Sequence, residues 1–541
     1  MIGSQKYDKI RSFVLVQTGV TSERGYRFSG FSQTVSWPQE DGTQLGMAGT
    51  WNLLFRIGAC PQKVEENHLH VPEEGDVLYV VAEATFSLQT EKTLLEWMDR
   101  GGRIVASGYP EAWQFAFPQN VFLKSAKIVN PYTGLAWLQE GAKPELLAPP
   151  NWKYLTIQFE NPCPLECKGK LAAISGERQT SSRAHITPIE DAPALLCLEK
   201  LIYFNGNPFG ALQSWLQGQE SLLPWLEWRH RIFWLDEYTA FIYKILKEYR
   251  LLNKLEGGIP SLGQTTVIFR HDLDHSRDTT YLDMESQASF PGVYAILKDG
   301  NTGFWLDKLR SNPGHESAFH YNTGSYSRIL EEIRNKIFKL PKRTYRPDKS
   351  AVKEKGLLSQ VKWAKKNKIG IETLHRHLAF IVYPELVDAL DTVYNNELDV
   401  LGSSSFFTGT VLRWGINEVE GMNGTVSDFT DPQFPYWFPF KLAHAGHGGR
   451  LLRGWESTSI MEIEPGLVEQ MLNYNIPGLP QKVLVFNYHP AHANRPTFVK
   501  GGCASWFRDI LDLCKSKGVQ VRTLSEVYKV LNDHLERTHG K

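Results

Sequence analysis

The sequence predicts an α/β protein whose C-terminal half is a (β/α) barrel. From Thr265 onward, short apolar strand patterns alternate with amphipathic helix patterns over about 280 residues, which is typical of a barrel of β/α units. In the N-terminal half, residues 75–82, 91–99 and 101–108 indicate strand, helix, glycine turn and strand, a right-handed βαβ unit. Both halves are therefore expected to contain parallel strands covered by helices.

Four segments are expected along the chain. Residues 1–110 carry the βαβ unit, which resembles the flavodoxin-like, amidotransferase-type domains that accompany some carbohydrate enzymes. Residues 111–225 show short strands separated by Pro and Gly, so a β-rich accessory region is predicted there, giving an N-terminal flavodoxin-like/α+β region. In residues 226–258 apolar side chains recur at helical spacing, which predicts a helical connector. The barrel is then expected over residues 259–541.

The composition is that of an ordinary globular protein. Apolar residues make up 42% of the 541 residues and charged residues 22%. Lys+Arg and Asp+Glu balance at 59 each, so no net charge attracts nucleic acid or an anionic membrane. No stretch is suited to a secretory leader or a bilayer span, so a cytoplasmic protein without a membrane span is expected. Six widely spaced cysteines do not form a disulfide framework.

Two aspartates are the most informative residues of the chain. Asp272 and Asp274 follow the β-branched run Thr265–Ile268, which is typical of a buried strand. Residues two apart on a strand share a face, so both carboxylates are expected to point the same way. Such a pair is costly to bring together without a positive charge, which a metal ion usually supplies. One aspartate can then bind the metal while the other moves a proton; loop capping is the plainer alternative for the pair.

Longer motifs around these residues resemble those of a known family. The R-H-D-x-D sequence at residues 270–274 and the G-H-E-x-x-x-H sequence at residues 314–320 resemble the first two motifs of NodB-type polysaccharide deacetylases, of the carbohydrate esterase family four superfamily. The resemblance implies a distorted (β/α)7 barrel that holds a divalent metal, typically zinc, and removes acetyl groups from sugars. It also implies that Asp272 is the catalytic base and that Asp274 is a metal ligand.

The same resemblance assigns roles to three histidines. His320 ends the second motif and falls on a metal ligand, but the family's next histidine, four residues on, is Gly324 here. His377, in an element that looks like R-x-H-Y-L with His375 in place of the arginine, is then the candidate for the missing ligand. His489 ends the final motif, an apolar strand that closes on a histidine, and falls on the general acid.

Hydrolysis of an amide or ester at neutral pH needs groups of these kinds. A zinc site lowers the pKa of bound water to about 7 and polarises the acyl oxygen. The carboxylate of Asp272 is suited to take the proton of the water, and the imidazole of His489 is suited to protonate the leaving group. The predicted function is a metal-dependent deacetylase whose partner is a carbohydrate substrate.

Two other functions stay open. A non-catalytic sugar-binding or scaffold protein on a decayed barrel is suggested by Gly324, which stands where a ligand is expected. A glycoside hydrolase on a related barrel pairs Asp272 with a distant acid such as Glu316. Taken singly, a histidine such as His320 is more often a core residue, His375 and His377 are also explained as a pair on a solvated loop, and His489 is also explained as a turn residue. Their order, each at the end of its own β segment, favours a site.

Overall fold

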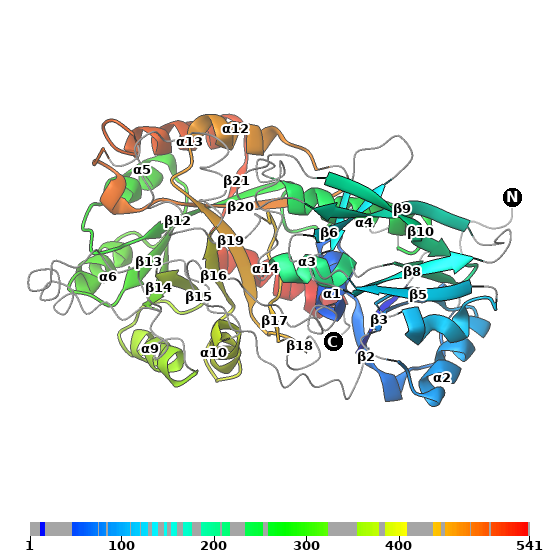
Figure 1. Ribbon diagram of the computed structural model, residues 1–541. Helices are drawn as coiled ribbons and strands as arrows, with labels where there is room; N and C mark the ends of the chain where they lie inside the picture. The colour runs from blue at the N-terminus through cyan, green and yellow to red at the C-terminus, as the bar shows by residue number, and fades with distance from the viewer. Residues whose placement is uncertain are drawn as a thin grey trace, which may run out of the picture.

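The computed structural model has two halves, a barrel and a large mixed sheet, which share a hydrophobic core (Figure 1). The structure describes residues 11–16, 46–73, 75–82, 85–108, 110–119, 121–127, 133–138, 145–148, 153–159, 166–175, 185–205, 208–216, 233–252, 258–322, 354–377, 385–407, 436–444, 450–476, 478–496 and 499–538. Within these ranges, no helix combines the length and the hydrophobicity that crossing a membrane requires.

The C-terminal half contains a closed barrel of seven parallel strands. In ring order the strands are β12 (Thr265–Asp272), β13 (Val293–Leu297), β14 (Glu316–Asn322), β15 (Thr373–His377), β16 (Gly402–Phe407), β19 (Trp455–Met461) and β20 (Lys482–Asn487). β12 pairs with both β13 and β20, which closes the ring, and the short β21 (Gln520–Val521) pairs with β12 outside it. The predicted (β/α) barrel of seven strands is confirmed.

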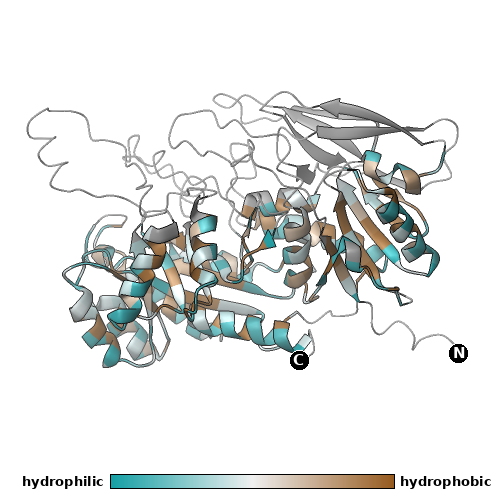
Figure 2. Cartoon of the chain, turned by 90° about the horizontal axis from the view of Figure 1, so that it is seen from below, coloured by the Kyte–Doolittle hydropathy of each residue, from teal (hydrophilic) through white to brown (hydrophobic). Residues whose placement is uncertain are grey.

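Helices cover the outside of the barrel. They are α5 (Thr280–Ala288), α6 (Thr302–Arg310), α9 (Glu354–Lys366), α10 (Glu385–Tyr394), α12 (Pro465–Asn473) and α13 (Ala504–Ser516). In α13, Phe507, Ile510 and Cys514 recur at the spacing of one helical face, and all three are buried. Strand β13 is covered on both faces, and it is apolar and buried at all five positions. Figure 2 shows hydrophobic colouring along the strands and hydrophilic colouring on outward helix faces.

The end of the barrel at which the strands begin is closed. Helix α14 (Leu524–Thr538) lies across it, and the hydroxyl of Tyr528 donates a hydrogen bond to the carbonyl oxygen of Ser403, near the start of β16, at 2.6 Å. The candidate site lies at the other end, where the strands finish, as in other barrels of this kind.

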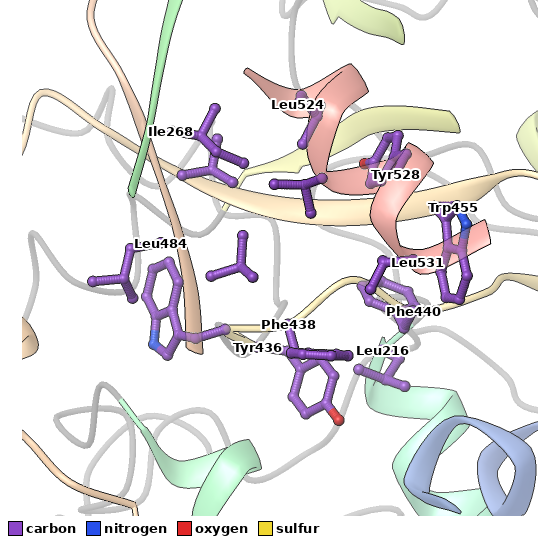
Figure 3. Close-up of a cluster of buried hydrophobic side chains, with 14 of the residues drawn as sticks. Leu216, Ile268, Tyr436, Phe438, Phe440, Trp455, Leu484, Leu524, Tyr528 and Leu531 are labelled. Atoms are coloured by element: carbon purple, nitrogen blue, oxygen red, sulfur yellow. The ribbon is translucent and has the colours of Figure 1, made fainter. Parts of the chain in front are cut away.

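The N-terminal half packs against this closed end. Helix α1 (Gly46–Arg56) places the ring of Phe55 4.9 Å from the ring of Trp455, the first residue of β19. Figure 3 shows part of the shared core, in which side chains of α14 such as Leu531 lie beside Trp455 and Phe440. The two halves are therefore held together by buried aromatic and aliphatic side chains.

A nine-stranded sheet forms the centre of the N-terminal half, in the order β2-β1-β3-β4-β11-β10-β9-β6-β7. The bounds are β1 (Ser12–Val16), β2 (Gln62–Glu65), β3 (Val77–Ala82), β4 (Arg103–Gly108), β6 (Thr133–Leu138), β7 (Glu145–Ala148), β9 (Glu166–Ser175), β10 (His185–Cys197) and β11 (Leu201–Phe204). Strand β3, helix α2 (Leu88–Asp99) and the parallel strand β4 form the predicted βαβ unit. Because β11 pairs with β4, one sheet contains strands of both segment 1–110 and segment 111–225.

The remaining strands form two separate pairs. Strands β5 (Val121–Lys127) and β8 (Lys153–Phe159) pair with each other, as do β17 (Ala443–His444) and β18 (Arg450–Leu451). The other helices are α3 (Pro208–Leu216) and α4 (Trp234–Glu248), and α4 falls in the segment for which a helical connector is predicted. Arg56 of α1 and Asp236 of α4 form a fully buried ion pair with an Nη2–Oδ1 distance of 2.9 Å.

Candidate metal centre and its proton-transfer groups

Asp272 is the last residue of β12, and Asp274 lies two residues beyond it. Asp272 is buried, whereas 27% of the Asp274 side chain is exposed. Arg270 donates hydrogen bonds from Nε to Oδ1 and from Nη2 to Oδ2 of Asp272, both at 2.9 Å. Asn487, at the end of β20, donates a third hydrogen bond to Oδ2 at 2.9 Å. These bonds hold the Asp272 carboxylate in one orientation.

The charges around both carboxylates keep them ionised. Burial by itself raises the pKa of Asp272, but the Arg270 guanidinium and the His320 imidazole outweigh burial and lower the pKa well below its usual range. The pKa of Asp274 is also lowered, because hydrogen bonding to His320 and the charges of nearby histidines outweigh its burial. Two negative groups at one end of the barrel favour a cation between them.

Asp274 converges with two histidines from neighbouring strands. His320 is the fifth residue of β14 and His377 is the last residue of β15. Oδ1 of Asp274 lies 3.4 Å from Nε2 of His320 and 3.5 Å from Nε2 of His377. One ligand atom from each residue lies within 4.8 Å of the others. The structure therefore brings together the three residues that the sequence assigns to a metal.

This spacing fits a tetrahedral ion. An ion with bonds of about 2.1 Å separates its ligand atoms by about 3.4 Å, which is close to both of the measured oxygen–nitrogen distances. Oδ1 of Asp274 and both ring nitrogens of His320 are buried, and within the described part of the chain the contacts of His320 with Asp272 and Asp274, at 3.4 Å, are longer than ordinary hydrogen bonds. A carboxylate oxygen and two imidazole nitrogens are ordinary zinc ligands, and three protein ligands are the usual number in a catalytic zinc site.

The pKa values of the two histidines differ. Burial lowers the pKa of His320, but the charges of Asp272 and Asp274 and their hydrogen bonds outweigh it and raise the pKa to about 9. Burial and the nearby charge of His320 lower the pKa of His377 to about 4. His377 is thus neutral, the form that binds metals, and a metal at this point competes with a proton for His320.

His489 follows β20 and faces the two aspartates. Its Nε2 lies 3.6 Å from Oδ2 of Asp274 and 3.8 Å from Oδ2 of Asp272. Its Nδ1 lies 3.1 Å from Oε1 of Glu462, which also accepts a hydrogen bond from the His489 backbone N–H at 2.8 Å. A carboxylate at Nδ1 fixes the ring, so that Nε2 faces the metal-binding residues.

Glu462 is a residue of the site that the sequence analysis missed. It follows β19 directly and has a φ of 50°, a left-handed conformation that costs about 1–3 kcal/mol in a non-glycine residue. Its Oε1 lies 3.0 Å from Nδ1 of a second histidine, His492. Burial raises the pKa of Glu462, but its hydrogen bonds with His489 and His492 outweigh burial and lower the pKa to about 2. The signal available in the sequence was an acid directly after a strand.

Glu316, the acid that a glycoside hydrolase would pair with Asp272, lies elsewhere. It is the first residue of β14, four residues before His320, or about 13 Å along the strand. Its Oε2 accepts a hydrogen bond from the backbone N–H of Ser525 at 3.0 Å, and its Oε1 accepts one from the hydroxyl of Thr373. Glu316 therefore caps α14 at the closed end of the barrel, where it cannot act with Asp272.

His375 is not one of the three residues that converge at the candidate metal centre. His375 is buried in the barrel wall, with its Nε2 3.2 Å from the hydroxyl oxygen of Thr373. Gly324 lies outside the described residues. The third member of the metal-binding group is His377, as the sequence suggests.

Comparisons with known proteins gave matches only among solved structures. No family model and no curated protein matches the chain. Among solved structures, Agd3, a novel carbohydrate deacetylase, aligns over 98% of this chain and 88% of its own, with 9% identity and a TM-score of 0.30. A putative polysaccharide deacetylase involved in O-antigen biosynthesis from Bordetella bronchiseptica aligns over 50% of this chain and 90% of its own, with 11% identity and a TM-score of 0.24.

A glycosidase gives a match of similar strength. The α-L-fucosidase isoenzyme 2 from Paenibacillus thiaminolyticus aligns over 46% of this chain and 33% of its own, with 15% identity and a TM-score of 0.27. At TM-scores this low, no property of these proteins is transferred to this chain.

Proposed function

We propose that this chain is a metal-dependent hydrolase that removes acetyl groups from an N- or O-acetylated carbohydrate. The observation that carries the proposal is the convergence of Asp274, His320 and His377, at spacings that suit a tetrahedral cation. Asp272 and His489 lie beside these residues and supply a carboxylate and an imidazole for proton transfer. Acetylated sugars are proposed as substrates because the motifs and their order resemble those of NodB-type deacetylases.

In this proposal Asp274, His320 and His377 hold the metal, with zinc as the proposed ion. A zinc ion held by such ligands supplies a water with a pKa of about 7 and a Lewis acid for the acyl oxygen.

Asp272 and His489 divide the two proton transfers. Asp272 accepts a proton from the attacking water, while Arg270 keeps the carboxylate ionised and aimed. His489 gives a proton from Nε2 to the leaving amine or alkoxide, and Glu462 holds the N–H at Nδ1 so that Nε2 faces the substrate. The products are acetate and a sugar with a free amine or hydroxyl group.

Metal analysis tests the ligand assignment. The purified protein is expected to contain about one tightly bound divalent ion per chain, and Asp274→Ala should lose it, because two histidines fall short of three ligands. Metal content is measured by mass spectrometry after gel filtration. The control is Asp307→Ala, which removes a carboxylate that is 78% exposed on α6 and should leave the metal in place. A fully retained ion in Asp274→Ala would contradict the assignment.

Glu462→Gln tests the support of the general acid. Glutamine keeps one oxygen acceptor, but it removes the negative charge that three N–H groups of His489 and His492 share. We expect acetate release from acetylated sugars to fall about 10–100-fold, a part of the gain that general acid catalysis provides, with metal content unchanged. Glu464→Gln, two residues along the chain, is the matched control, because Glu464 makes no side-chain cap to its helix. Equal rates for both variants would remove Glu462 from the mechanism.

A further inference from the structure

His271 stands between Arg270 and Asp272 on β12, but it points to the other side of the strand. Its ring is fully buried under the helices outside the barrel. The ring of Tyr281, on α5, stacks on it at 5.1 Å, and the ring of Tyr294, on β13, stacks on it at 4.7 Å. His271 therefore has no contact with the metal-binding residues, and the mechanism above gives it no role.

Both nitrogens of the His271 ring face acceptors. Nδ1 lies 3.0 Å from the carbonyl oxygen of Tyr488, and Nε2 lies 2.8 Å from Oε1 of Glu285. Burial raises the pKa of Glu285, but the charge of His271 and the hydrogen bonds around the carboxylate outweigh burial and lower it, so Glu285 is a carboxylate that only accepts. A carbonyl oxygen also only accepts. Both ring nitrogens therefore lie against acceptors, and these two contacts fix the ring between Tyr488 and Glu285.

The carbonyl of Tyr488 belongs to the residue that precedes His489. The backbone ladder between β12 and β20 ends at this place, where the N–H of Tyr488 donates to the carbonyl of Arg270 at 2.8 Å. Beyond it, the side chain of His271 on β12 contacts the carbonyl oxygen of Tyr488 after β20. The proposed base, Asp272, follows His271, and the proposed acid, His489, follows Tyr488.

We propose that His271 is a positioning residue, which sets the separation of His489 from Asp272 by holding the carbonyl of Tyr488 with a ring that Glu285 fixes. The inference rests on the proposed function and deepens it. Nε2 of His489 lies 3.8 Å from Oδ2 of Asp272, and a misplacement of about 1 Å in such a group costs about 100-fold in rate. Arg270 orients the base, and His271 orients the acid.

The chain offers a matched control in His315, which contacts the same carboxylate. Nδ1 of His315 lies 3.4 Å from Oε2 of Glu285, and it also accepts a hydrogen bond from the backbone N–H of Gly292 at 3.0 Å. No hydrogen bond or ion pair found for His315 in the described ranges reaches β12 or β20. Changing His315 thus disturbs Glu285 without touching the link between the two strands.

The test compares His271→Gln with His315→Gln on two kinds of substrate. One is a mixture of N-acetylated chito-oligosaccharides and O-acetylated xylo-oligosaccharides, whose leaving groups need a proton. The other is 4-nitrophenyl acetate, whose leaving group departs without one. We expect His271→Gln to lose about 10–100-fold on the sugars with its rate on 4-nitrophenyl acetate and its metal content unchanged. His315→Gln should keep both rates.

Two outcomes would overturn the inference: an equal loss on both substrates in His271→Gln, which indicates general damage, or no loss on either. Glu285→Gln is a second variant, which keeps an acceptor for His271 but removes the negative charge of the carboxylate. It should show the same selective loss on the sugars, and a loss on both substrates or on neither would count against the inference.

If the wild type releases no acetate, the proposed function fails. Two measurements that need no enzymatic activity then still test the positioning role of His271. Nitrogen-15 spectra of labelled histidine should show a hydrogen-bonded Nδ1–H on His271, and an Nδ1 without a proton would overturn the contact with the Tyr488 carbonyl. A crystal structure of His271→Gln should show the ring of His489 displaced by about 1 Å, and an unmoved ring would overturn the positioning role.

Discussion

Asp272→Asn is expected to lower acetate release from acetylated sugars about 10²–10⁴-fold, the range that loss of a general base produces. Asparagine has the shape of aspartate and keeps an oxygen for a hydrogen bond from Arg270, but it cannot take a proton from water. The metal-binding residues Asp274, His320 and His377 are unchanged, so the metal content should stay at about one ion per chain. The measurement is acetate release at saturating substrate, beside metal analysis of the same sample.

The control for this variant is Asp307→Asn on the exposed face of α6, which should keep the wild-type rate. Loss of the metal together with the rate would give Asp272 a different role. Its Oδ1 lies 3.4 Å from Nδ1 of His320, so it would then act by orienting a ligand. An unchanged rate with the metal in place would remove Asp272 from the reaction altogether.

The convergence of Asp274, His320 and His377 could be predicted from sequence because one rule covers all three residues. Asp274, His320 and His377 each stand at or near the finishing end of a β segment, and the strands of a barrel finish on one side. Once the strands are parallel, residues far apart in the chain must meet there. The rule needs only the positions of the strands, which short-range patterns give.

Glu462 and Glu316 show where that rule stops. Glu462 acts through a left-handed backbone that turns its carboxylate toward His489, and no local pattern indicates this conformation in a glutamate. Glu316 stands close to His320 in sequence but at the starting end of the same strand, so it reaches α14 instead of the site. Both residues are glutamates, so residue type does not distinguish their roles. Their positions do, because Glu462 follows the end of β19 whereas Glu316 begins β14.

The organisation of the N-terminal half was harder to predict for a related reason. Strand β11 lies next to β4 in the sheet, although the β-rich segment between them separates the two in sequence. Hydrophobic periodicity identifies each strand, but it carries no information about which distant strand becomes its neighbour. The packing of α1 against the start of β19 was equally hard to predict, because Phe55 and Trp455 are far apart in sequence and meet only in the folded chain.

The buried pair of Arg56 and Asp236 is expected to give the largest effect on stability. Nη2 of Arg56 lies 2.9 Å from Oδ1 of Asp236, the guanidinium lies 4.4 Å from the ring of Phe438, and Oδ2 of Asp236 accepts the backbone N–H of Trp437 at 3.2 Å. Asp236→Asn keeps the acceptor for Trp437 but leaves a buried guanidinium without its counter-charge. We expect it to lower the free energy of unfolding by about 3–5 kcal/mol, measured by urea denaturation at pH 7.

Removing the charges of both Arg56 and Asp236 should lower the free energy of unfolding less than removing the charge of Asp236 alone. In Arg56→Met with Asp236→Asn, the apolar thioether replaces the guanidinium against Phe438, so no unpaired charge stays buried. A double variant that is no more stable than Asp236→Asn alone would show that the single loss comes from packing and not from the stranded charge.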